Sequence, residues 1–106
     1  MIAVIFEVTV DPEQGGRYFD LASDLHAELV EPEGFLSIER FQSLSAENKY
    51  VSLSFWRDRD AVEAWYRRPN HKAAQAEGRG GIFQDYRIRV AEVFRDYDLA
   101  AGRPPT

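Results

Sequence analysis

The sequence predicts an α+β fold of the ferredoxin-like type, in which a four-stranded antiparallel sheet and two helices follow the order β-α-β-β-α-β. Two amphipathic helical patterns alternate with four strand-like runs, and a connection of hairpin length joins the two middle runs. The length of 106 residues allows one domain. We expect residues 1–98 to form this domain and residues 99–106 to form a C-terminal tail.

The first strand and the first helix are the clearest elements. Residues 2–10 (IAVIFEVTV) are nearly all apolar and rich in β-branched side chains, which is typical of a strand covered on both faces. Turn residues follow at 11–16. Residues 17–30 then carry apolar side chains at helical spacing, which predicts a helix that ends before Pro32 and Gly34.

The two middle strands, residues 35–44 and 49–57, each alternate between two kinds of face. We expect the aliphatic faces to pack on the helices; these carry Leu36, Ile38 and Leu44 on one strand and Val51, Leu53 and Phe55 on the next. The opposite faces mix aromatic and small polar side chains, among them Phe41, Tyr50, Ser52, Ser54 and Trp56. One chain has no further element to cover this second face. The pattern therefore predicts a two-fold homodimer, sheet against sheet.

The second half of the chain predicts a helix and a final strand. Asp58 is a good N-cap for a helix that contains Trp65 and Tyr66. Pro69 interrupts this helix, and Asn70 can cap a short continuation that ends at the glycines of residues 78–81. The final strand spans residues 82–97, with Tyr86, Ile88 and Val90 on one side and Arg87 and Arg89 on the other.

Composition excludes several kinds of function. The chain has no cysteine, which removes disulfides, thiolate metal sites and cysteine nucleophiles. Its net charge of −5 has the wrong sign for sequence-independent binding of nucleic acid. No apolar run approaches the length of a membrane span, and no signal peptide opens the chain. We expect a cytoplasmic protein with neither nucleic-acid nor membrane partners.

The two histidines differ in whether the sequence favours a functional role. His26 borders the apolar stripe of the first helix, where a satisfied boundary residue is the simplest interpretation. His71 opens a short helix after a proline, where the helix dipole favours the neutral imidazole and hence a base; the alternative is a solvent-facing cap.

Other candidate residues are aromatic or cationic. Trp65 is either core or the wall of an aromatic pocket, Tyr66 and Tyr86 are candidate hydrogen-bond donors, and Arg87 either holds an anion or pairs with an acid. No metal-ligand spacing, phosphate loop or serine elbow is present. An enzyme of this sequence would therefore deprotonate, orient and shield a small molecule in a pocket.

Two segments carry a family resemblance: FWRDRDAVEAWYRRPNHKAAQAEGR at residues 55–79 and YRIRVAEVFRDY at residues 86–97. They resemble the antibiotic biosynthesis monooxygenase (ABM) family of dimeric α+β barrels, and in particular a small bacterial subgroup. The resemblance implies oxidation of a phenolic, quinol or anthrone-like substrate by O₂ without metal, flavin or haem, the substrate enolate or phenolate itself reducing oxygen.

The resemblance also assigns roles to residues. It implies Trp65 as a pocket wall, His71 as base and Arg87 as anion stabiliser. Tyr66, Gln75 and Tyr86 are the candidate substrate-binding residues.

Two alternatives stay open beside the monooxygenase. The same pocket could bind a small aromatic compound without chemistry, because a fold alone does not define a function. Haem-degrading relatives require an asparagine on the first strand and a histidine ten residues after the tryptophan. This chain has no asparagine in residues 2–10 and has Gln75 at the second position, which disfavours haem oxygenation.

Overall fold

The computed structural model describes residues 1–29, 32–68, 73 and 76–102. Four antiparallel strands form one sheet in the order β2-β3-β1-β4. The elements in chain order are β1 (Ile2–Val10), the 3₁₀ turn η1 (Pro12–Gln14), α1 (Gly15–Leu29), β2 (Phe35–Gln42), β3 (Lys49–Trp56), α2 (Arg59–Tyr66), the π-type turn η2 (Gly78–Ile82) and β4 (Phe83–Glu92). The order and the pairing confirm the predicted ferredoxin-like α+β fold.

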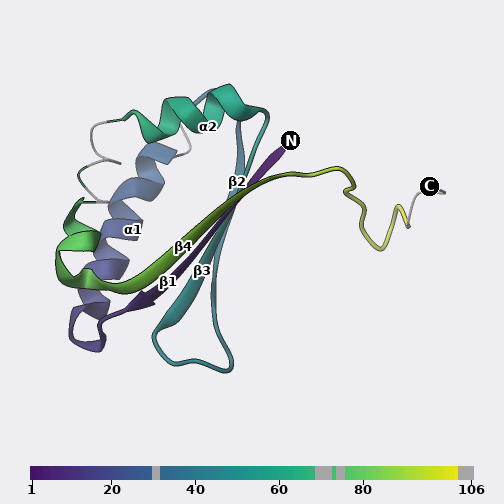
Figure 1. The fold of residues 1–106 in the computed structure, drawn as a ribbon. Coiled ribbons are helices and arrows are strands. Elements are labelled where there is room, and N and C mark those ends of the chain that lie inside the picture. Colours follow the sequence, from purple (N-terminus) through teal and green to yellow (C-terminus); the bar gives the residue numbers. More distant parts are fainter. Residues whose placement is uncertain (30–31, 69–72, 74–75, 103–106) are drawn as a thin grey trace.

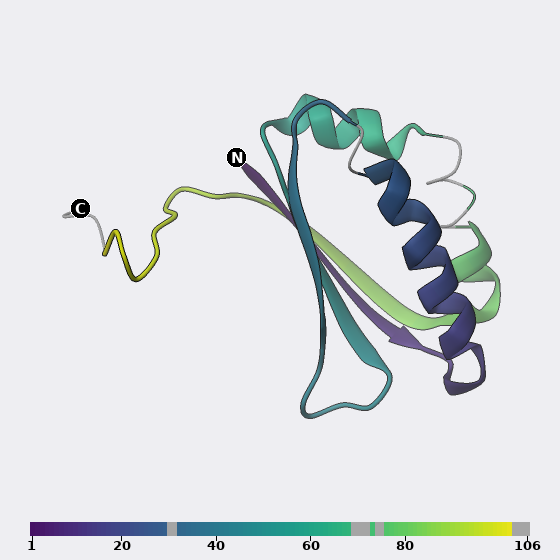
Figure 2. The same ribbon diagram turned by 180° about the vertical axis from the view of Figure 1, so that it is seen from behind.

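The molecule has two layers. Both helices lie on one face of the twisted sheet, and in the described part of the chain no element covers the other face (Figure 1). The view from behind shows α1 running along the sheet and α2 crossing near its upper end, while the segment after β4 leads away from both layers (Figure 2). We call the uncovered side the outer face.

The core between the layers is divided into two clusters. One lies under α2 and joins Ile2, Trp56, Val62 and Trp65, with Phe35 and Leu25 packed against it. The other lies near the start of α1 and consists of Val8, Val10, Tyr18 and Ile82. The space between the two clusters is the place where a pocket can form.

The predicted orientation of β3 is wrong. Trp56 is 1% exposed in the core, Ser52 and Ser54 are buried, and Tyr50 stacks on Tyr18 of α1. Because side chains alternate along a strand, the remaining residues, Val51, Leu53 and Phe55, lie on the outer face. A tryptophan buries more apolar surface than any of these three, and the Ser54 hydroxyl accepts the hydrogen bond of its indole N–H.

The neighbouring strand β2 shows only part of the expected pattern. Its register with β3 shifts between Phe35 and Ser37, so that Leu36 is 53% exposed whereas Phe35 and Ile38 both pack on the core. Leu44 lies beyond the end of the strand and is fully exposed. Phe41 lies on the outer face, as expected, opposite Val51.

The last strand is shorter than predicted. β4 ends at Glu92, opposite Ile2, and one more backbone bond joins the Val93 N–H to the Met1 carbonyl at 2.9 Å. The predicted continuation to Tyr97 is not observed, since residues 94–98 are not part of the sheet. Phe94 and Leu99 in this segment are almost fully exposed.

The start of α2 confirms the predicted cap. The Asp58 carboxylate accepts the Ala61 backbone N–H at 2.9 Å. The helix ends at Tyr66, and the expected break at Pro69 and new cap at Asn70 lie outside the described residues. No helix in the described part of the chain has the length and apolar character needed to cross a bilayer.

Gly34 connects the end of α1 to the sheet and is required by geometry. Its φ is +89°, its carbonyl accepts the Arg57 N–H at 2.7 Å, and an added Cβ would lie 2.7 Å from Cβ of Ala61. Gly34→Ala should lower the free energy of unfolding by about 2–4 kcal/mol, through backbone strain and the clash with α2. Chemical denaturation measures this change.

Gly16→Ala is the matched control. Gly16 lies in α1, where an added Cβ would meet nothing within 4 Å, and alanine there should stabilise by up to about 1 kcal/mol. Equal stability of the two variants would contradict the proposed role of Gly34.

Candidate functional site

A pocket lies between the two helices and the inner face of the sheet. Along β3 the inward side chains run Tyr50, Ser52, Ser54, Trp56, so two short residues stand between two large ones. The short side chains leave the floor of the pocket hollow, and Trp56 walls one end of it. The cavity measures about 150 Å³.

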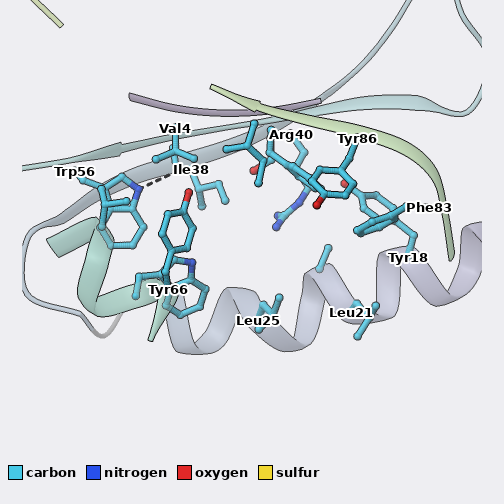
Figure 3. A pocket seen from close by; sticks show the side chains of 17 residues that line it. Val4, Tyr18, Leu21, Leu25, Ile38, Arg40, Trp56, Tyr66, Phe83 and Tyr86 are labelled. Carbon is cyan, nitrogen blue, oxygen red and sulfur yellow. Dashed lines mark hydrogen bonds between the residues drawn. The ribbon is translucent and has the colours of Figure 1, made fainter. Parts of the chain in front are cut away.

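The lining of the pocket is mostly apolar. Aliphatic side chains come from the sheet and from α1, among them Val4, Ile38 and Ile88 on the strands and Leu21 and Leu25 on the helix (Figure 3). A dry apolar cavity of about this volume is large enough to hold a benzene ring. The site therefore suits a ligand that has at least one ring or a short hydrocarbon chain.

The end of the pocket below α2 is built from indole and phenol rings. The Trp56 Nε1–H donates to Ser54 Oγ at 3.0 Å, and the Trp65 ring centroid lies 6.3 Å from that of Trp56. Tyr66 points its hydroxyl toward the sheet between these groups (Figure 3). Burial raises the pKa of the Tyr66 hydroxyl above 10.0, and the nearby Glu63 carboxylate adds to the rise.

The opposite end combines aromatic rings with one cation. The rings of Tyr18, Phe83 and Tyr86 form a group, with centroids 6.1 Å apart for Tyr18 and Phe83 and 6.3 Å apart for Phe83 and Tyr86. Arg40 reaches from β2 toward α1 into this end (Figure 3). Burial raises the pKa of Tyr18, whereas the charge of the Arg40 guanidinium and its hydrogen bond to the phenol oppose that rise.

The structure brings together three of the predicted site residues. Trp65, Tyr66 and Tyr86 line the same pocket, and Trp65 is both core and wall, so its two interpretations are compatible. His71 and Gln75 lie outside the described residues.

Arg87 does not join this group. Its neighbours along β4, Tyr86 and Ile88, point into the pocket, so alternation places Arg87 on the outer face. Arg89 lies on the same outer side and pairs with Glu7 at 3.1 Å. The expected convergence of Arg87 with Trp65 in one pocket of this chain is not observed.

Sequence reasoning missed the cation that does line the pocket. Arg40 is two residues from Ile38, which was expected to face the helices. Since side chains of a strand alternate with a period of two, this spacing places Arg40 on the same face and could have identified it. In the described residues no group of three histidine, aspartate or glutamate side chains is arranged to hold a metal ion.

Comparison with protein families and curated relatives gives a consistent result. Residues 1–77 match the family model described as "Antibiotic biosynthesis monooxygenase". Over 93 residues the chain is 41% identical to the "Jasmonate monooxygenase ABM" of the fungus Pyricularia oryzae, covering 88% of this chain but only 43% of that protein. It is 31% identical to the uncharacterized protein YqjZ of Bacillus subtilis, covering 88% of this chain and 79% of that protein. The chain thus spans less than half the length of the fungal relative, and the similarity is not confined to bacteria.

A solved structure shares the fold at low sequence identity. A mutant form of SnoaB, described as a cofactor-independent oxygenase from Streptomyces nogalater, superposes with a TM-score of 0.78 at 15% identity. The match covers 90% of this chain and 94% of SnoaB. At this identity the comparison supports the architecture alone.

Both buried tyrosines should ionise late. Since the pKa values of Tyr18 and Tyr66 are raised above 10.0, Tyr18→Phe and Tyr66→Phe should each remove a tyrosinate absorbance step that lies above pH 10 in the folded protein. Arg40→Met should move the Tyr18 step further upward, because it removes the opposing charge.

The same pKa shifts of Tyr18 and Tyr66 determine how the free energy of unfolding changes with pH. The contribution of a raised tyrosine pKa is fully present below pH 10 and is lost as the pH rises through the folded-state value. The free energy of unfolding should therefore fall more steeply above pH 10 in the wild type than in either phenylalanine variant. Parallel curves for all three proteins would contradict the assignment.

Proposed function

The chain belongs to the antibiotic biosynthesis monooxygenase family, and from this premise we propose that it is a monooxygenase that uses O₂ to oxidise a small ring-containing substrate in the pocket between the helices and the sheet. The observation that carries this proposal is the pocket itself, a largely apolar cavity lined by Trp56, Trp65, Tyr66 and Tyr86. Such a lining limits the access of water to a reactive carbanion and fixes its orientation.

The proposed substrate is phenolic, quinol or anthrone-like, and the reaction needs no cofactor. For an anthrone, the CH₂ group loses two hydrogens and gains one oxygen to become a carbonyl, while the second oxygen atom leaves as water. All electrons come from the substrate once a base has removed its proton. This choice rests on the family resemblance of residues 55–79 and 86–97.

We assign the base to His71, on the family resemblance, and the walls to the described residues. We assign to Trp65 the role of limiting the position of the ring, and to Tyr66 and Tyr86, which also line the pocket, the donation of hydrogen bonds to substrate oxygen atoms. Arg40 takes the place that was expected for Arg87, because it is the arginine found in the pocket among the described residues.

Oxygen uptake tests the activity. Metal-free protein is mixed with an anthrone, with hydroquinones and with jasmonate, the last because of the name of the fungal relative. Uptake above autoxidation is expected with at least one compound. His71→Ala should lower turnover by about 10²–10⁴-fold, as for loss of a general base. His26→Ala, at an exposed position on α1, is the matched control and should retain full turnover.

A second variant tests the place of the reaction. Ser52→Leu should fill the hollow floor of the pocket and abolish uptake while the far-UV circular dichroism stays unchanged. Full activity in this folded variant would show that the reaction takes place elsewhere. A ligand that binds but is recovered unchanged, without oxygen consumption, would replace the monooxygenase with the binding alternative.

We further propose that the outer face pairs with a second copy of the chain. Ile5, Val51, Leu53 and Phe55 are only half-buried there, and Phe41 is 46% exposed. The salt bridge between Glu7 and Arg89 lies at one side of this apolar area. A flat apolar sheet face of this kind suits a two-fold, self-complementary interface.

Leu53→Glu tests the pairing. A charge at the centre of an apolar interface should convert a dimer, with twice the 12.2 kDa mass of the chain, into a monomer. Light scattering after size exclusion measures the mass. Leu44→Glu, at a fully exposed leucine of the β2–β3 hairpin, is the control and should leave the mass unchanged. A monomeric wild type would reject the dimer.

A further inference from the structure

Arg40 is a cation placed in an apolar pocket without a carboxylate. Among the described residues, Arg17, Arg57 and Arg89 each form an ion pair with an aspartate or glutamate, whereas no such pair involves Arg40. The Arg40 guanidinium acts on the phenol of Tyr18, which is neutral at physiological pH. The guanidinium therefore retains donors and a charge that the described protein groups do not match.

Arg40 is partly buried, and a guanidinium that loses water without gaining a charged partner is costly for folding. Desolvation disfavours the charge, and an isolated phenol returns only a part of the lost hydration. A methionine or leucine at position 40 would pack the same apolar pocket without that cost. An anionic group on a bound ligand would compensate the charge directly.

We propose that the pocket takes a small hydrophobic carboxylate, whose carboxylate is held by Arg40 and whose apolar body lies between the β3 serines and the tryptophans. The proposal deepens the proposed function, since it takes the substrate site to be the same pocket. The acid function is a binding handle, and the oxidised ring or chain is the remainder of the molecule.

The charge state favours a carboxylate over a phenol at this position. A carboxylic acid is already ionised at pH 7, whereas a phenol has a pKa near 10 and must lose its proton before it can neutralise the guanidinium. The planar fork of an arginine also matches the two oxygens of a carboxylate, while a phenolate offers one oxygen.

The register of the sheet indicates how long a ligand can be if it reaches from Arg40 to the tryptophans. Arg40 pairs with Ser52, and Trp56 is four residues further along β3, which corresponds to about 13 Å between their positions in the sheet. Ser54, between them, has its hydroxyl engaged by Trp56. The polar end and the indole end of the pocket are therefore separated by enough space for one ring and a short chain.

Binding of a matched pair of probes tests the proposal. We choose 4-phenylbutanoate and its methyl ester, which share the ring and chain and differ in charge. Their affinities are measured by calorimetry and by quenching of Trp56 and Trp65, which both line the pocket. The wild type should bind the acid at least about tenfold more tightly than the ester, the ratio typical of a charged hydrogen bond.

Variants of Arg40 test whether this residue causes the preference for the acid over the ester. Arg40→Met should remove the preference for the acid, so that the acid and the ester bind with similar affinity. Arg40→Lys should keep part of the preference, because it preserves the charge without the fork. Arg87→Met is the matched control on the outer face and should keep the full preference.

Each contrary result would reject one part of the proposal. Equal binding of acid and ester, or no binding of either, would reject the carboxylate ligand. A preference that survives in Arg40→Met would reject Arg40 as its cause. Because binding is measured without turnover, a retained preference together with no oxygen uptake from any substrate would reject the proposed monooxygenase while leaving the carboxylate site in place.

Discussion

The burial of Trp56 between α2 and the sheet determines the rest of the structure. Its side chain is 1% exposed, its indole N–H donates to Ser54, and its ring meets Phe35 edge-on at 5.4 Å. Because side chains alternate along a strand, the inward orientation of Trp56 determines the face on which each remaining residue of β3 lies. It turns the two serines toward the helices and the aliphatic residues of β3 toward the outer face.

Both faces of the sheet are therefore largely apolar, whereas an ordinary two-layer protein has a polar outer face. The side under the helices carries short polar residues at its centre, so helix and sheet cannot close completely and a cavity remains. The outer side carries aliphatic residues that no described element covers. A hollow core and an apolar exterior are both explained if the chain evolved to enclose a ligand on one side and a second copy on the other.

The sequence was sufficient for the architecture because the signals were local. Strand runs, the helical stripe of α1 and the Asp58 cap each depend on neighbouring residues, and all three are found as predicted. The faces of β3 were predicted the wrong way round, because alternation shows that two faces differ without showing which one is inside. The rule that aliphatic residues lie inside failed where one tryptophan outweighed three smaller side chains. The end of β4 was also predicted wrongly, because apolar side chains continue beyond Glu92 whereas the strand does not.

Site residues on strands follow from the same choice of face. Once Trp56 points inward, Tyr86 enters the pocket and Arg87 must leave it, and the cation of the site becomes Arg40 from the edge strand. The two buried clusters consist of apolar side chains, and Arg40 lines the pocket beside them. A charged group retained beside a cavity, at a cost to folding and without a carboxylate partner among the described residues, is best explained by what the cavity binds. The cost of burying the charge and the position of Arg40 in the pocket thus both indicate a ligand group at this end.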